Sequence, residues 1–145
     1  MFSIKFEEDD VPAGTNDMAI GRIIAGDLNE EFRSAIGYWS SDDYRQQWIR
    51  AVGVVLADDA RAALITSIEG LPGSGALDWW PMYREGDLVY VQFQLLVLAD
   101  LIRPFDVRHP EHSLAPHTQI DEDSNHISEW VVGAEDLDKF RRACQ

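Results

Sequence analysis

Cysteine is nearly absent from this chain of 145 residues, in which Cys144 is the only one. A single thiol cannot form an internal disulfide, which excludes a disulfide-stapled scaffold and suits a reducing compartment. Long apolar runs are also missing: the longest, such as Leu95–Ala99, fall far short of the roughly 20 residues of a membrane-spanning helix. The N-terminus lacks the basic and apolar regions of a signal peptide. We therefore expect a cytoplasmic protein.

Basic residues are scarce. The chain has 12 Lys and Arg against 26 Asp and Glu, a formal net charge of −14. Nucleic-acid backbones and anionic membranes are bound through clustered cations, so the composition disfavours both as direct partners. A basic protein is the natural complement, because opposite potentials steer association. The alternative is that the acidity only keeps the protein soluble.

The sequence also lacks an assembled catalytic motif. Gly73-Ser74-Gly75 does not have the context of a nucleophile elbow or a phosphate-binding loop, and a flexible connection explains it better. Neighbouring carboxylates such as Asp42 and Asp43 point in different directions on a helix and do not form an acid–base pair. We expect no catalytic residues, no cofactor and no enzyme activity.

Three of the four histidines fall close together, as His109, His112 and His117. Zinc requires three or four ligands, and Asp106 or Glu111 could complete such a set. The spacing matches no standard zinc motif, and the segment is rich in proline. An exposed loop is the favoured interpretation, and a small metal-dependent enzyme is the alternative.

Apolar residues make up 46% of the chain, enough for a buried core. Alternating apolar positions predict a strand over Phe2–Phe6 and a hairpin of Ala19–Ala25 and Glu31–Tyr38. A buried strand is predicted over Ala62–Ile68, and a second hairpin of Leu77–Arg84 and Leu88–Val97 around Glu85-Gly86-Asp87. In its second arm one face carries Val89, Val91, Phe93, Leu95 and Val97. Pro81 predicts an edge or a bulge.

The best helix signal covers Ser41–Leu56. Ser40 is a good N-cap and Asp43 can complete a capping box, while Trp39 and Tyr44 are spaced as a hydrophobic staple. A long loop from Arg103 to Asn125, a strand over His126–Val132 and a helix over Ala134–Ala143 follow. In the last helix, Leu137, Phe140 and Cys144 are expected to face the core. The sequence thus predicts an α+β fold over residues 1–145 as a single domain: a mostly antiparallel sheet with two helices packed on it.

Tryptophan is frequent, at five residues. Trp79 and Trp80 are consecutive on a strand, so they must point to opposite faces of the sheet. Unless helices cover both faces, one of them is exposed and is a candidate anchor for a partner.

Several landmarks in their order resemble a family of immunity proteins from bacterial contact-dependent growth inhibition systems. They are Met1-Phe2-Ser3-Ile4, Tyr38-Trp39-Ser40, the helix with Tyr44, Gln47 and Trp48, Ala63–Ser67, Trp79–Asp87, Val89–Gln92 and Ile127–Trp130. The resemblance implies a cytoplasmic protein that binds the C-terminal toxin domain delivered by a sibling cell, commonly a nuclease, and neutralises it without covalent chemistry. An acidic adaptor or structural subunit of another complex is the alternative.

The resemblance carries no residue-level binding motif, so the toxin-facing surface is predicted from charge. A nuclease presents a basic cleft, which carboxylates can cover. Two clusters next to strand ends qualify, Glu7-Glu8-Asp9-Asp10 and Asp121-Glu122-Asp123. Trp79 is added as the aromatic anchor. The alternative for each cluster is a solvated loop.

Overall fold

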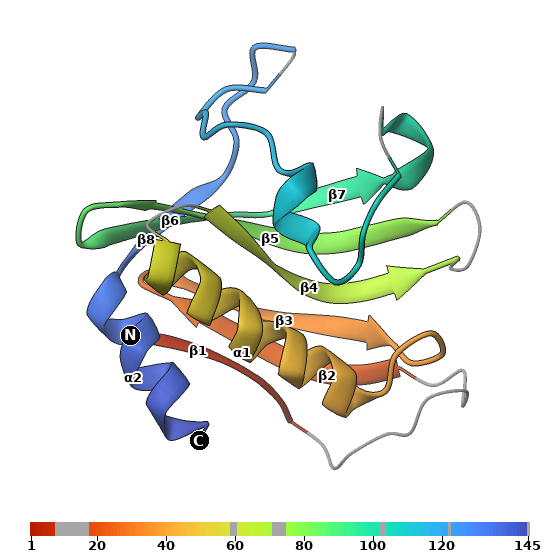
Figure 1. Ribbon diagram of the computed structural model, residues 1–145, viewed down its shortest axis with the longest axis horizontal. Coiled ribbons are helices and arrows are strands. Elements are labelled where there is room, and N and C mark those ends of the chain that lie inside the picture. The colour runs from red at the N-terminus through yellow and green to blue at the C-terminus, as the bar shows by residue number, and fades with distance from the viewer. Residues whose placement is uncertain (8–17, 59–60, 71–74, 102–103, 122, 145) are drawn as a thin grey trace.

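The computed structural model describes residues 1–7, 18–58, 61–70, 75–101, 104–121 and 123–144. Its N-terminal part is an antiparallel sheet with the strand order β1-β2-β3 (Figure 1). The strands are β1 (Phe2–Phe6), β2 (Met18–Ala25) and β3 (Leu28–Ala35). The predicted strand and hairpin are confirmed, but the second arm begins at Leu28 and ends at Ala35, where the prediction had Glu31 and Tyr38, so the hairpin turn is tighter than predicted. It contains only Gly26 and Asp27, and the φ of +61° at Gly26 suits such a turn.

A second antiparallel sheet has the order β4-β5-β6-β8, with β7 also paired to β5. Its strands are β4 (Arg61–Glu69), β5 (Ala76–Glu85), β6 (Leu88–Gln92), β7 (Gln94–Val97) and β8 (Glu129–Gly133). The predicted arm Leu88–Val97 is therefore wrong as one strand, because it divides at Phe93 into β6 and β7. Pro81 lies on β5 where the partner on that side changes from β7 to β6. A residue without an N–H fits this gap in the ladder.

The main helix, α1 (Ser41–Asp58), begins at the predicted residue and ends two residues later than predicted. The backbone N–H of Ser40 donates to Asp43 Oδ2 (2.9 Å), and the N–H of Asp43 donates to Ser40 Oγ (3.2 Å). These reciprocal bonds form the predicted capping box. The rings of Trp39 and Tyr44 lie 5.2 Å apart in an edge-on arrangement, which confirms the staple.

Side chains of α1 join the two sheets. β3 and β4 run side by side beneath this helix (Figure 1), but no backbone ladder pairs them. The Tyr44 hydroxyl donates to Ala35 O on β3 (2.7 Å) and accepts from the N–H of Ile68 on β4 (3.0 Å). The Gln47 carboxamide and the Trp48 indole bond other backbone groups of β4. Side chains of α1 thus provide the hydrogen-bond partners that a neighbouring strand would otherwise provide. Buried backbone N–H and C=O groups require such partners.

The C-terminal helix, α2 (Ala134–Ala143), has the predicted bounds. Leu137 is fully buried, and Phe140 stacks on Phe2 of β1 with ring centroids 5.1 Å apart. Cys144 is exposed, so the prediction that it faces the core is wrong. Cys144 caps α2 in a helical conformation, with its N–H bonded to Phe140 O (3.3 Å), but the core that covers Leu137 does not extend to this end of the helix.

Between β7 and β8 the chain is mostly irregular, as predicted. It contains two short 3-10 helices, η1 (Leu98–Asp100) and η2 (Pro110–Ser113), and an isolated bridge between Ile120 and His126. The last strand begins at Glu129 and not at His126. The predicted α+β class is confirmed, with the strands divided over two antiparallel sheets. Within the described ranges, no helix is long and apolar enough to cross a membrane.

Candidate functional site

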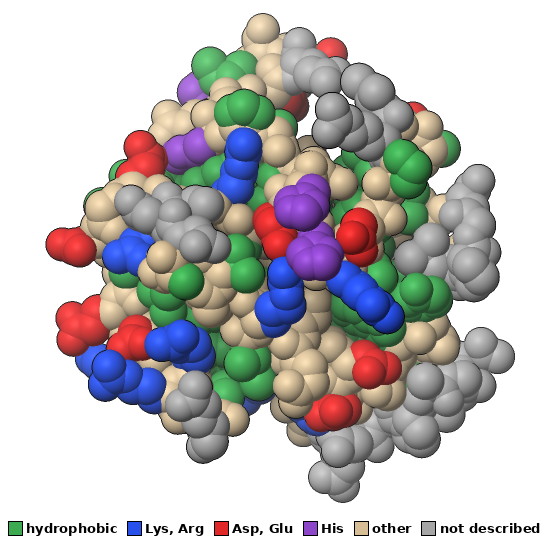
Figure 2. Space-filling model, in the orientation of Figure 1, with side chains coloured by type: hydrophobic (Ala, Val, Ile, Leu, Met, Phe, Trp, Pro, Cys, Tyr) green, Lys and Arg blue, Asp and Glu red, His purple; other side chains and the backbone are tan. Residues whose placement is uncertain are grey.

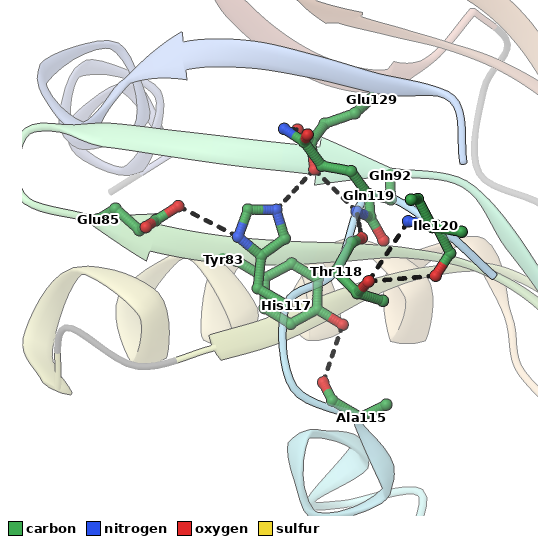
Figure 3. A network of polar contacts seen from close by, with 9 residues as sticks. All are labelled: Tyr83, Glu85, Gln92, Ala115, His117, Thr118, Gln119, Ile120 and Glu129. Atoms are coloured by element: carbon green, nitrogen blue, oxygen red, sulfur yellow. Dashed lines mark hydrogen bonds and ion pairs between the residues drawn. The ribbon is translucent and has the colours of Figure 1, made fainter. Parts of the chain in front are cut away.

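His117 ties the segment that precedes β8 to the β5–β6 hairpin. Its Nε2 atom lies 2.6 Å from Glu129 Oε2, and its Nδ1 atom lies 3.1 Å from Glu85 Oε2. Figure 3 shows the imidazole between these two carboxylates, which come from β8 and β5. When protonated, the ring donates to both carboxylates, and two charge-assisted bonds hold the segment in place.

Glu129 is the centre of the network in Figure 3. Besides His117, its carboxylate accepts hydrogen bonds from Gln92 Nε2 on β6 (2.8 Å) and from Gln119 Nε2 (3.1 Å). Burial alone would raise the pKa of this carboxyl. Together, the hydrogen bonds from His117, Gln92 and Gln119 lower the pKa by more than burial raises it. The pKa of Glu129 therefore lies below its ordinary value. The folded chain therefore favours the ionised carboxylate.

Two tyrosines of the hairpin complete the attachment. The Tyr83 ring stacks on His117 with centroids 4.8 Å apart and planes 15° from parallel, and Tyr90 lies 5.1 Å from the same imidazole. The Tyr83 hydroxyl donates to Ala115 O (3.0 Å), and burial raises the pKa of Tyr83. These contacts fix where the next part of the chain, which carries one of the predicted acidic clusters, leaves the sheet.

Asp121 and Asp123 of that cluster lie in a tight loop closed by the Ile120–His126 bridge. Asp121 Oδ1 accepts hydrogen bonds from the N–H groups of Asp123 and Asn125, both at 2.9 Å. Ser124 has a φ of +65°, which lets the loop turn back. Asp123 is exposed, and Glu122 lies outside the described residues. The Asp121 carboxylate thus holds the loop together. The exposed side chain of Asp123 has no such role in the bonds given above and faces solvent.

Of the other predicted cluster, Glu7-Glu8-Asp9-Asp10, the structure describes Glu7 only. Glu7 follows β1, and its carboxylate pairs with Arg22 Nε on β2 (3.1 Å). Glu8, Asp9 and Asp10 lie outside the described residues. Glu7 belongs to the first sheet and Asp121 to a loop beside the second.

Trp79 and Trp80 point to opposite faces of β5, as predicted, but neither is exposed. Their exposed fractions are 1% and 2%. On one face Trp79 packs edge-on against Phe105, 6.2 Å away, and on the other Trp80 lies 4.8 Å from Phe93. The expectation of an exposed anchor at Trp79 is therefore wrong, because a loop residue covers this face where the prediction considered only helices.

An exposed apolar strip on β7 and just before it could not be predicted from the sequence. Phe93, Leu95 and Val97 are 41%, 58% and 40% exposed, whereas Val89 and Val91 of β6 are buried. The predicted common face of all five residues is wrong, because the break at Phe93 separates the strands. A hollow of about 480 Å³ lies beside this strip, lined among others by Trp130 and Asp121. The only signal in the sequence for the break was Pro81 on the facing strand.

The histidines do not gather into one site. His109 and His112 stack with centroids 5.2 Å apart, while His117 belongs to the network described above. Arg50 of α1 holds η2 in place through Glu111, with Nη2 2.9 Å from Oε1. Figure 2 shows two neighbouring histidine side chains among basic and acidic ones on the face that carries α1. Among the residues that the structure describes, no three His, Cys, Asp or Glu are grouped to hold a metal ion.

Known proteins share both this sequence pattern and this fold. Residues 34–140 match the family model described as the CdiI N-terminal domain. The protein named Immunity protein CdiI from Enterobacter cloacae subsp. cloacae is 28% identical over 108 residues, 74% of this chain and 74% of that protein. A chain of the solved CdiA-CT/CdiI toxin and immunity complex from Enterobacter cloacae matches 99% of this chain and 97% of its own length. Its TM-score is 0.86 at 24% sequence identity, a likeness in fold.

The family match covers most of the chain, from β3 to α2, and includes the network around His117. It confirms the resemblance found in the order of the sequence landmarks. The chain belongs to the CdiI N-terminal domain family, the immunity proteins of contact-dependent growth inhibition.

Proposed function

We propose that this protein binds and neutralises the cognate toxin C-terminal domain of a contact-dependent growth inhibition system, in the cytoplasm of the cell that makes it. Neutralisation is non-covalent and stoichiometric, and the protein performs no catalysis. The observation that carries this proposal is the family match over residues 34–140. The related Enterobacter cloacae protein is itself named an immunity protein, and the similar fold comes from a toxin and immunity complex.

Charge supports a basic toxin, and specifically a nuclease. The net charge of −14 favours association with a cationic surface, and a nuclease must present such a surface to its substrate. Carboxylates that cover this surface would block the site that nucleic acid needs. Glu7, with the neighbouring Glu8, Asp9 and Asp10, and the loop of Asp121, Glu122 and Asp123 remain the proposed contacts. Trp79 is buried and is therefore not among the proposed toxin contacts.

The test is co-expression with the toxin domain encoded immediately upstream, followed by purification and calorimetric titration of the pair. We expect a tight one-to-one complex and restored growth of cells that produce the toxin. The absence of a complex, together with continued killing, would refute the immunity function.

The acidic loop is tested separately with Asp123→Lys, because changing Asp121 would also break the bonds that hold the loop. We expect weaker toxin binding and slower association at low salt, where electrostatic steering is strongest. Glu135→Lys on α2 is the control with the same change of charge, since that side chain is 84% exposed. Equal effects of the two variants would remove the loop from the interface.

A further inference from the structure

An open groove follows β5 and β7 on the face that carries Trp80. Asp78 and Trp80 alternate with Trp79 along β5, so they share the face opposite Trp79. Leu95 of β7 lies directly across from Asp78 in the register and therefore joins this face. Phe93 and Glu30 line both neighbouring hollows on this side, so the two hollows adjoin, and together they are called the groove.

The floor of the groove is aromatic. The Trp80 ring lies 4.8 Å from Phe93 and 6.1 Å from Trp130. The Trp80 indole donates to Thr66 Oγ1 (3.2 Å), which fixes the ring that supports Phe93. Phe93 and Leu95 are 41% and 58% exposed, so apolar surface in the groove remains in contact with solvent. Apolar side chains that line a hollow in this way are typical of binding surfaces.

The rim of the groove is acidic. Its carboxylates are those of Glu30, Glu31, Glu69, Asp78 and Asp121. Among the described residues that line it, Arg33 is the only basic one. Burial, and then the nearby charge of Glu69, raises the pKa of Asp78. Asp78 is thus held as a partly buried carboxylate beside Glu69, and a cation brought by a partner would stabilise its charge.

We propose that this groove is the docking site for an arginine-bearing segment of the cognate toxin, with the guanidinium over the aromatic floor and its N–H groups directed at the carboxylate rim. This inference rests on the proposed immunity function and adds the surface and the chemistry of its partner. The groove is continuous with the acidic loop through Asp121, so the two form one surface.

Arginine fits the groove better than lysine. A guanidinium is planar, stacks on aromatic rings and offers several N–H groups to carboxylates at once, whereas an ammonium is a strongly hydrated point charge. An apolar residue next to the arginine would cover Leu95 and Val97. The partner segment therefore combines a cation with an apolar side chain.

The experiment is titration of the cognate toxin domain into the full chain and its variants, by calorimetry and by association kinetics. Phe93→Leu keeps an apolar side chain and removes the aromatic face, and we expect the Kd to rise about 3- to 10-fold, the range of a partly exposed cation–π contact. Phe93→Tyr keeps the aromatic face and should bind like the unchanged protein. An unchanged Kd for Phe93→Leu would overturn the stacking arrangement.

The rim is tested with Glu30→Lys, an exposed position of β3, against Glu135→Lys as the control of equal charge change. We expect at least a tenfold rise in Kd and slower association for Glu30→Lys only. Thermal unfolding of each variant checks that the fold is intact. Equal effects of the two reversals would overturn the groove while the immunity function stands.

Two further outcomes would also refute the inference. If the unchanged protein does not bind the toxin domain at all, the immunity function fails, and the docking site fails with it. If sedimentation shows that the protein alone is a dimer that Glu30→Lys dissociates, the groove holds a second copy of this chain and not a toxin segment.

Discussion

The carbonyl oxygen of Val131 lies too close to residue 26 to leave room for a Cβ atom there. Gly26 lies in the turn between β2 and β3, and Val131 lies in the middle of β8, so this contact joins the hairpin turn of the first sheet to the edge strand β8 of the second. The φ of Gly26 is +61°, a conformation that side chains disfavour. Glycine is therefore required here twice, for the turn and for the close approach of another backbone.

Gly26→Ala should destabilise the fold more than the matched change Gly86→Ala. Gly86 also has a positive φ, +65°, in a hairpin turn, but nothing lies within 4 Å of the place of its Cβ. We expect Gly86→Ala to cost about 1–2 kcal/mol from backbone strain alone. Gly26→Ala should cost about 1–3 kcal/mol more, because backbone must also shift. Urea unfolding of both variants measures the difference in stability. Equal losses of stability would show that β8 can move away from residue 26 without destabilising the fold.

Tyr44→Phe should weaken the junction of the two sheets. The change removes the hydroxyl that donates to Ala35 O and accepts from the N–H of Ile68, and both backbone groups lose this partner. Leaving buried polar groups unpaired costs about 1–3 kcal/mol. Tyr38→Phe is the control, because Tyr38 is 42% exposed. Denaturant unfolding compares the two, and a loss below about 0.5 kcal/mol for Tyr44→Phe would show that β3 and β4 hold together without the bridge.

Asp43→Ala should shorten or loosen the start of α1. It removes the carboxylate that accepts from the backbone N–H and the hydroxyl of Ser40. The expected loss of stability is about 1 kcal/mol, as for other N-terminal capping contacts. Asp42→Ala, in the same turn, removes a charge near the positive end of the helix dipole and should cost less. Thermal unfolding distinguishes the two, and the reverse order would contradict the capping role.

Features that depend on neighbouring residues could be predicted from the sequence. The capping box and staple of α1 need only residues within two turns of one helix, and the first strand needs only the alternation from Phe2 to Phe6. The bounds of α2 follow in the same way from its charges and spacing. In each case the partners lie close in the chain, so their spacing alone determined the contact.

Features that depend on distant segments could not be predicted. The apolar alternation from Val89 to Val97 continues through Phe93, so nothing within the arm itself indicates the break between β6 and β7. The burial of Trp79 depends on Phe105, which comes from an irregular segment. The sequence also grouped His117 with His109 because they are close in the chain. Its carboxylate partners instead come from β5 and β8, which only the sheet brings together.

The net charge of the chain leads to the prediction of a basic partner, but it does not locate the surface that such a partner would bind. Both proposed acidic clusters were found as runs of adjacent carboxylates, and a run is visible in a sequence. The rim of the groove is assembled from β3, β4, β5 and the loop before β8, with carboxylates such as Glu30, Glu69 and Asp78 that are far apart in the chain. Such a surface becomes visible only when the strands are paired.

Glu129→Gln should lower stability at neutral pH and lose this effect in acid. The pKa of Glu129 is lower in the folded chain than its ordinary value of 4.5, so its ionised form stabilises the fold above that pH. This contribution disappears as the pH falls below about 4.5 and through the folded-state pKa. We expect the variant to be about 1–3 kcal/mol less stable at pH 7, the cost of weakened bonds to a charged group, and this difference to shrink as the pH falls below about 4.5. Urea unfolding across this range measures both proteins, with Glu135→Gln on α2, whose side chain is 84% exposed, as the control for the loss of one charge. A constant gap between Glu129→Gln and the unchanged protein from pH 7 to pH 3 would mean that the carboxylate charge does not hold the segment of His117 to the sheet.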